Sequence, residues 1–110
     1  MNCPKCEGKP MEVAQVSGVG VDRCARCGGV WLDPGELDQL STLEWAEVRG
    51  VAGGKGVPEL NQKRAQCPRD GAALLRVYSA QRKSVVLDRC GQCGGLWLDG
   101  GELRSLLSGG

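Results

Sequence analysis

One cysteine motif occurs twice in the chain, and its spacing constrains the fold more than any other feature of the sequence. Each copy has a short turn that begins Cys-Pro and, further along, a Cys-x-x-Cys turn. Seven cysteines and one aspartate fill the eight equivalent positions: Cys3, Cys6, Cys24 and Cys27 in the first copy, and Cys67, Asp70, Cys90 and Cys93 in the second. Residues 28–37 and 94–103, directly after the last cysteines, are also nearly the same, so the chain is a tandem duplication.

The duplication predicts two small units, residues 1–50 and 67–110, joined by a Gly-rich linker over residues 51–66 that couples them only weakly. Each unit is close to the size of about 40 residues below which an apolar core alone seldom stabilises a fold. The chain also contains no Phe and no His, so a bound metal ion is the expected substitute for a larger core. A disulfide framework is the alternative, but it needs an oxidising compartment and normally an even number of cysteines, and there are seven.

A β-hairpin is predicted between the two cysteine turns of each unit. In the first unit, the strand-like segments 11–16 and 19–23 flank Ser17-Gly18. In the second unit, segments 73–78 and 84–89 flank residues 80–82. These segments contain the β-branched or apolar residues that a small sheet requires: Val13, Val16, Val19, Val21, Leu75, Val77, Val85 and Leu87.

A helix is predicted to follow each Trp-Leu pair. Asp33 is the expected N-cap of the first helix, with Pro34 at its first position and Glu36 as the capping-box partner. Asp99 and Glu102 repeat the pattern in the second unit. An apolar stripe predicts that the first helix continues to about Gly50, whereas the second should be only about two turns long.

Zinc is the metal that this motif favours, because structural zinc sites take four tetrahedral ligands and two short turns joined by a hairpin supply four. The alternatives at the four-cysteine site are redox-active thiols or iron in a rubredoxin-like site. In the second unit we expect Asp70 as the fourth ligand, since a carboxylate oxygen can bind zinc. A solvated Asp70 beside a three-cysteine site, with water as the fourth ligand, or a site that has lost its metal, are the alternatives. No His or second carboxylate is placed to act as a base, so no catalysis is expected.

Glycine and tryptophan follow each second cysteine turn. Gly28, Gly29, Gly94 and Gly95 are expected to turn the backbone with positive φ and to direct amide groups at the sulfur atoms. Trp31 and Trp97 are expected to pack in the core, with stacking on nucleic acid as the alternative. Trp45 has no counterpart in the second unit and is expected to be partly exposed at a contact surface.

The combined pattern resembles the transcription factor IIB-type zinc ribbon family of small bacterial proteins. The resemblance rests on the CPxC turn, the hairpin and the sequence DxCxxCGGxWLDxGEL, which occurs over residues 22–37 and 88–103. It implies a small metal-stabilised protein of two tandem zinc ribbons, each a β-hairpin plus knuckles followed by a short α-helix, with one zinc per ribbon. The chain departs from the family pattern at Asp70.

A cytoplasmic location and a non-enzymatic role follow from the remaining features. No leader precedes Cys3, and no apolar run approaches the roughly 20 residues that span a bilayer. Seven thiolates and two zinc ions would change the formal charge from +1 to −2, which favours a protein partner over nucleic acid. The chain is therefore expected to be a protein-interaction module that binds two Zn²⁺, related to transcription by family analogy; the sequence names neither the partner nor an oligomeric state.

Two alternatives belong to other functional classes. Nucleic acid could bind to basic side chains of the second unit, which are Arg69, Arg76, Arg82, Lys83 and Arg89. A zinc or redox sensor could use the site with three cysteines and Asp70.

Overall fold

The computed structural model describes residues 1–6, 8–43, 48, 64–78 and 86–107. These residues fold as a repeat of three strands and one short helix. The first unit contains β1 (Glu12–Val16), β2 (Val19–Arg23), β3 (Val30–Leu32) and α1 (Glu36–Ser41). The second contains β4 (Leu74–Tyr78), β5 (Val86–Cys90), β6 (Leu96–Leu98) and α4 (Glu102–Leu107).

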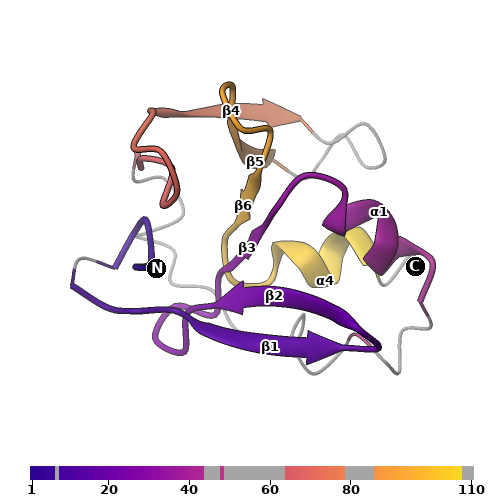
Figure 1. Cartoon of the computed structure of the whole chain (residues 1–110). Helices are drawn as coiled ribbons and strands as arrows, with labels where there is room; N and C mark the ends of the chain where they lie inside the picture. The colour runs from indigo at the N-terminus through magenta and orange to yellow at the C-terminus, as the bar shows by residue number, and fades with distance from the viewer. Residues whose placement is uncertain (7, 44–47, 49–63, 79–85, 108–110) are drawn as a thin grey trace.

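The strands of the two units form one antiparallel sheet in the order β1-β2-β3-β6-β5-β4 (Figure 1). The two halves meet at its centre, where β3 pairs with β6 and Trp31 lies opposite Trp97. The expectation of weakly coupled units is therefore wrong for the folded chain. The linker sequence could not reveal this, because the coupling comes from strand pairing and the predicted linker over residues 51–63 lies outside the described residues.

Both predicted hairpins are confirmed. In the first, β1 and β2 pair from Glu12 opposite Arg23 to Val16 opposite Val19. Ser17 and Gly18 between them both have positive φ, at 48° and 87°, which is the backbone of a tight type I′ turn. In the second, β4 pairs with β5, and the turn that joins them lies outside the described residues.

The helices begin later than predicted. Gly35, with φ at 88°, is the N-cap of α1, which starts at Glu36. Asp33 is therefore not a side-chain cap, although its backbone N–H donates to Glu36 Oε1 at 2.6 Å as a capping box requires. Asp99 N–H donates to Glu102 Oε2 in the same way at 3.1 Å. The Asp33 and Asp99 side chains instead have tryptophan and cationic partners.

The predicted helix length is correct for α4 but not for α1. Helix α1 ends at Ser41, earlier than the apolar stripe predicted, and most of the remainder of that prediction falls on residues 44–47 and 49–50, outside the described part. Helix α4, at six residues, is the predicted two turns. Trp45 also lies outside the described residues.

The central strands separate two buried clusters. One is aliphatic and packs α1 and α4 onto the sheet through residues such as Leu32, Leu40, Leu98 and Leu103. The other contains cysteines of both units together with Met11, Trp31 and Trp97. Figure 1 shows the two helices together on one side of β3 and β6, with the N-terminal turns of the units on the other. The cysteines of both units thus pack against the same two tryptophans, Trp31 and Trp97.

Trp31 and Trp97 are fully buried, as predicted, and each is packed by the other unit. A Cβ built on Gly29 would lie 2.2 Å from Trp97 Cζ2, and one on Gly95 would lie 2.3 Å from Trp31 Cζ2. Both distances are shorter than a carbon–carbon contact allows, so each ring packs directly against a glycine of the opposite unit. Gly28 and Gly94 have the predicted positive φ, whereas Gly29 and Gly95 are required for this close approach.

Candidate metal centres and the ribbon interface

The four cysteines of the first unit form a buried cluster. One ligand atom from each of Cys3, Cys6, Cys24 and Cys27 lies within 4.8 Å of the others. Cys3 and Cys6 come from the N-terminal turn, whereas Cys24 directly follows β2 and Cys27 precedes β3. The Sγ atoms of Cys3 and Cys27 are 3.8 Å apart, which equals the edge of about 3.8 Å in a tetrahedron with zinc–sulfur bonds of about 2.3 Å. This sulfur–sulfur distance and the spread of the four ligand atoms are consistent with a tetrahedral zinc site.

The proton chemistry of this cluster suits a cation. The hydrogen bond with Cys3 lowers the pKa of Cys27 to about 5, and the same contact raises the pKa of Cys3. Burial raises the pKa of Cys6 to about 11. One thiolate forms readily, but further thiolates beside it are unfavourable until a positive charge compensates them. Cys6 N–H also donates to Cys3 Sγ at 3.2 Å, as amides around zinc-bound thiolates do.

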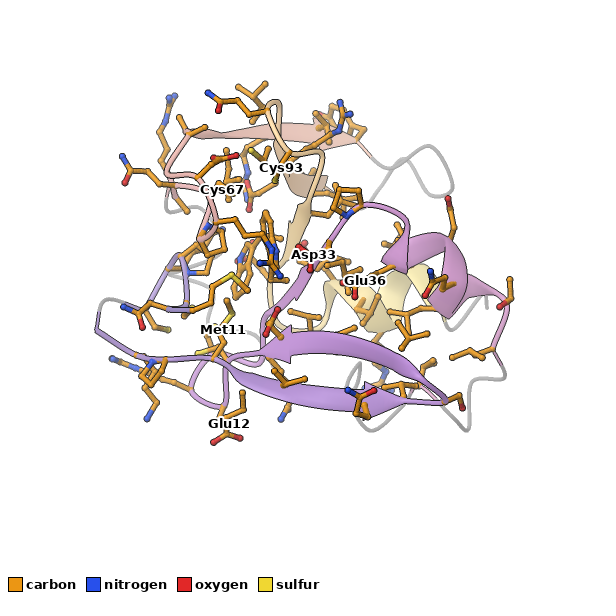
Figure 2. All side chains as sticks on the ribbon, in the orientation of Figure 1. Met11, Glu12, Asp33, Glu36, Cys67 and Cys93 are labelled. Atoms are coloured by element: carbon orange, nitrogen blue, oxygen red, sulfur yellow. The ribbon has the colours of Figure 1, made fainter. Side chains whose placement is uncertain are left out.

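The second unit brings together Cys67, Asp70, Cys90 and Cys93 with the same spread, one ligand atom from each within 4.8 Å. The Sγ atoms of Cys67 and Cys93 are 3.7 Å apart, and Figure 2 shows these two residues side by side. Amide groups again point at sulfur: Cys93 N–H donates to Cys90 Sγ and Gly95 N–H to Cys93 Sγ, both at 3.4 Å. The site differs in exposure, because Cys93 is partly exposed and Asp70 is exposed.

Asp70 is oriented toward the sulfur atoms. Its Oδ2 lies 3.3 Å from Cys90 Sγ, close to the edge of about 3.5 Å expected between a thiolate and a carboxylate oxygen on one tetrahedral zinc ion. Its Oδ1 accepts the Ala72 N–H at 2.9 Å, which fixes the carboxyl group and holds the pKa of Asp70 below its usual range. Both donor sets therefore fit zinc, and bound zinc would supply the positive charge that neutralises the clustered thiolates and crosslinks each unit.

A buried lysine of the first unit reaches into the second. Lys5, between two candidate ligands, has a side chain with 0% exposure. Its Nζ lies 3.1 Å from Asp88 Oδ2 and 2.8 Å from Asp99 Oδ1. Asp99 Oδ1 in turn accepts the Trp97 indole N–H at 3.0 Å. Lys5 therefore joins the first cysteine turn to β5 and to the end of β6.

Arg69 makes the equivalent contact in the opposite direction, from the second unit to the first. It occupies the position in the second unit that Lys5 has in the first, and it holds the first unit's Asp33 with two hydrogen bonds, from Nε to Oδ1 and from Nη2 to Oδ2 at 2.6 Å. Asp33 Oδ1 accepts the Trp31 indole N–H at 3.1 Å. The hydrogen bond from Arg69 lowers the pKa of Asp33, whereas burial raises the pKa of Asp22 even though the Arg69 charge opposes this rise. These two contacts, called here the Lys5 clamp and the Arg69 clamp, were not predicted from the sequence.

The clamps change the interpretation of the basic side chains. Arg69 is engaged with Asp33, and Arg76 lies 3.4 Å from Asp88 and 3.8 Å from Asp99. Arg89 is exposed and makes no ion pair with any described residue. Arg82 and Lys83 lie outside the described residues. Two of the three described members of the predicted basic set are thus engaged in intramolecular ion pairs at the surface.

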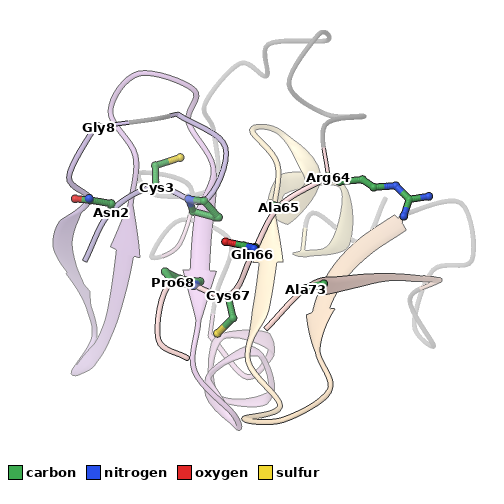
Figure 3. A pocket seen from close by; sticks show the side chains of 10 residues that line it. Asn2, Cys3, Gly8, Arg64, Ala65, Gln66, Cys67, Pro68 and Ala73 are labelled. Atoms are coloured by element: carbon green, nitrogen blue, oxygen red, sulfur yellow. The ribbon is translucent and has the colours of Figure 1, made fainter. Parts of the chain in front are cut away.

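An open groove of about 750 Å³ separates the two N-terminal turns. Figure 3 shows Asn2, Cys3 and Gly8 along one side and residues 64–68 along the other. No helix in the part of the chain that the structure describes is long and apolar enough to cross a membrane.

Comparison with known families agrees with the geometry. The family described as transcription factor zinc-finger, a TFIIB-type zinc ribbon, matches residues 2–42 and 66–109, one match for each unit. The chain belongs to this family. Its two units are tandem TFIIB-type zinc ribbons with two cysteine-rich metal sites. No curated protein and no solved structure shows significant similarity to the chain.

Sequence signals for the missed residues did exist. Lys5 and Arg69 are both basic and both lie between two candidate ligands, whereas Asp22 and Asp88 precede the second cysteine turn in the same way. Asp33 and Asp99 are likewise repeated after Trp-Leu. Charges that a duplication keeps at equivalent positions beside apolar strands indicate paired buried ions. The partner ribbon could not be inferred, because nothing local specifies which strands meet.

Proposed function

We propose that this tandem zinc ribbon is a non-enzymatic zinc-binding protein that acts as a protein-interaction module. The proposed ligands are Cys3, Cys6, Cys24 and Cys27 for one zinc ion, and Cys67, Asp70, Cys90 and Cys93 for the other. Support for the ligands comes from donor spacing and from amide groups that point at sulfur. The two ions would hold a sheet whose apolar clusters alone are small for a stable fold.

The outer edge of the second ribbon carries the proposed docking surface. Strand β4 is an edge of the sheet, so one side of its backbone pairs with no described strand. Its side chains Leu75 and Tyr78 are 59% and 75% exposed. Leu75 lies opposite Arg89 on β5, an exposed cation without an acidic partner in the described residues. An exposed apolar edge strand beside an arginine that makes no ion pair with a described residue suits an extended acidic segment of a partner protein.

The corresponding edge of the first ribbon offers a weaker surface. In the first ribbon, Glu12 on β1 lies opposite Arg23 on β2. The equivalent pair in the second ribbon is Leu75 on β4 opposite Arg89 on β5, so the first edge has an acidic residue where the second has an apolar one. Its one large exposed apolar side chain among the described residues is Val13, at 68%. The first edge thus supplies a matched control for docking at the second.

Nucleic acid is the less favoured partner. Phosphate binding needs several free cations along one face, and Arg69 and Arg76 are held by aspartates. Related transcription factor ribbons contact RNA polymerase, so a polymerase subunit is the partner that family analogy suggests.

The test is site-specific cross-linking in cells with a photoreactive amino acid in place of Tyr78, and in place of Val13 as the control. We expect a discrete protein adduct at Tyr78, absent at Val13 and lost when Leu75→Glu is added. Salt-dependent retention on DNA or RNA, with no protein adduct from Tyr78, would contradict the proposal.

A further inference from the structure

We propose that the two zinc sites are thermodynamically coupled, because each metal-bound turn holds the side chain that clamps the opposite ribbon. Filling one site should then raise the metal affinity of the other. The proposal rests on the zinc binding proposed above and adds an interaction between the sites to it.

The first route runs from the second site to the first. Arg69 lies between Cys67 and Asp70, so a metal ion on these ligands fixes the turn from which its guanidinium reaches Asp33. Asp33 receives the Trp31 indole N–H at 3.1 Å, and Trp31 belongs to β3, which begins three residues after Cys27. Order in the second turn is thereby passed to the strand that follows the first site's last ligand.

The second route runs in the opposite direction. Lys5 lies between Cys3 and Cys6, and its buried ammonium contacts Asp88 and Asp99. Asp88 is two residues before the ligand Cys90 in β5, and Asp99 receives the Trp97 indole N–H. A metal ion on the first turn therefore holds in place a buried cation that contacts two buried acids of the second ribbon.

The tryptophan rings form a third connection between the sites. The Trp97 ring covers Gly29, two residues after Cys27, and the Trp31 ring covers Gly95, two residues after Cys93. Each second cysteine turn is thus packed by a ring that the opposite ribbon positions. Because β3 and β6 also pair directly, neither turn can lose its order without exposing contacts of the other.

The sign of the coupling follows from the cost of ordering these turns. Without metal, each turn would have to give up its conformational entropy to place Arg69 or Lys5. When one ion is bound, its turn is already ordered and its clamp is in place. The second ion then binds to a ribbon that loses less conformational entropy on binding. Linkage requires the effect to be equal in both directions.

The test measures the zinc affinity of the first site by competition with a chromophoric chelator in the full chain. Disabling the second site with Cys93→Ser should weaken the first site by roughly tenfold or more. Arg69→Ala, which leaves all eight proposed ligands in place, should weaken it by about threefold to fivefold, as expected for an exposed ion pair. Added to Cys93→Ser, Arg69→Ala should have no further effect, since the clamp requires an ordered turn.

Arg26→Ala is the matched control. Arg26 is an exposed arginine between Cys24 and Cys27 that makes no ion pair with any described residue, so its removal should not change the affinity. If Cys93→Ser prevents folding, the difference between Arg69→Ala and Arg26→Ala still decides the matter. Coupling is wrong if the first site keeps its affinity in both Arg69→Ala and Cys93→Ser. Failure of zinc binding itself would be recognised differently, by the absence of zinc from the unmodified chain.

Discussion

The two ribbons share one motif and one fold, but their candidate metal sites differ in ligand type and in exposure to solvent. In the first ribbon the four donors are buried cysteines, and Lys5 between them is buried in the partner ribbon. In the second ribbon an exposed aspartate, Asp70, replaces one cysteine, and Arg69 has a side chain that is 48% exposed. The difference shows that a duplicated scaffold can keep its sheet and core while one metal site becomes accessible to solvent.

The aspartates that Lys5 and Arg69 contact also differ in their exposure to solvent. Asp88 and Asp99 are buried, and burial raises the pKa of Asp99 even though Lys5 is in contact with it. Arg76 adds a second cation from β4, opposite Asp88. The equivalent place on β1, opposite Asp22, is taken by Val13. The second ribbon's acids therefore depend on a buried ion network, whereas Asp33 lies in a partly exposed pair with Arg69, which lowers its pKa.

The largest predicted effect comes from removing one ligand of the buried site. Cys24→Ser should unfold both ribbons, because loss of the first metal frees β3 and with it the centre of the shared sheet. Heteronuclear NMR of the zinc-loaded chain should show dispersed resonances lost in both halves. If the resonances of β5 and β6 kept their positions, the ribbons would be independent and the shared sheet would not couple them.

The next largest effect compares the two clamps. Lys5→Met should cost about 3–5 kcal/mol of unfolding free energy, since it removes the buried cation that contacts Asp88 and Asp99 and leaves them only the partly exposed Arg76. Arg69→Ala should cost no more than about 1 kcal/mol, because its ion pair is largely exposed. Denaturant unfolding at saturating zinc measures both. Equal losses in the two variants would mean that burial does not distinguish the clamps.

A smaller effect is expected where the tryptophan rings cross. Gly29→Ala and Gly95→Ala should each destabilise the chain by about 1–3 kcal/mol, because the added methyl group overlaps a buried ring. Gly91→Ala is the control, since among the described residues a Cβ there would meet only Leu75 Cδ1, at an ordinary contact distance of 3.7 Å. Thermal unfolding should place both ring variants well below this control. A loss in one ring variant alone would show that the tryptophan packing is not symmetric.

The smallest predicted effect depends on pH. Burial, and then the Asp99 charge, raise the pKa of Glu102 to about 7 from 4.5. A raised carboxyl pKa means that the ionised group destabilises the fold, so stability should fall as the pH rises from about 4.5 to about 7. Glu102→Gln keeps an oxygen for the Asp99 N–H and removes the charge. The free energy of unfolding of Glu102→Gln should exceed that of the unmodified chain by about 1 kcal/mol at pH 8, after allowance for partial solvation. This difference should become smaller as the pH falls toward 5.

Glu36→Gln is the matched variant in the first ribbon. Burial also raises the pKa of Glu36, but its surroundings are more open, so the gain should be smaller. A gain for Glu102→Gln that did not change with pH would show that ionisation of Glu102 is not its cause.

Local patterns in the sequence predicted the local parts of this structure. The first hairpin follows from the valine-rich segments that flank Ser17-Gly18, and burial of Trp31 and Trp97 follows from their repetition in a chain with few aromatic residues. The family and the two clusters of candidate ligands follow from cysteine spacing. Each of these depends on residues close together in the chain.

Contacts between the repeats were not predicted. The pairing of Trp31 with Trp97 joins segments that no local periodicity relates, and the Lys5 clamp connects residues from opposite halves of the chain. The start of α1 was misplaced for a related reason, because the Asp33 side chain is held by Trp31 and Arg69 and cannot cap a helix. In each case a contact with the other ribbon overrides the local preference.

Stepwise removal of zinc tests the central contrast most directly. Zinc-loaded chain should contain two zinc ions by elemental analysis, and a graded chelator series should remove about one equivalent before the other, since Asp70 is a harder and more exposed ligand than Cys6. Asp70→Cys should bring the two steps together, and Asp70→Ala should move the first step to lower chelator concentration. Simultaneous loss of both ions from the unmodified chain, with no change in Asp70→Ala, would contradict the account.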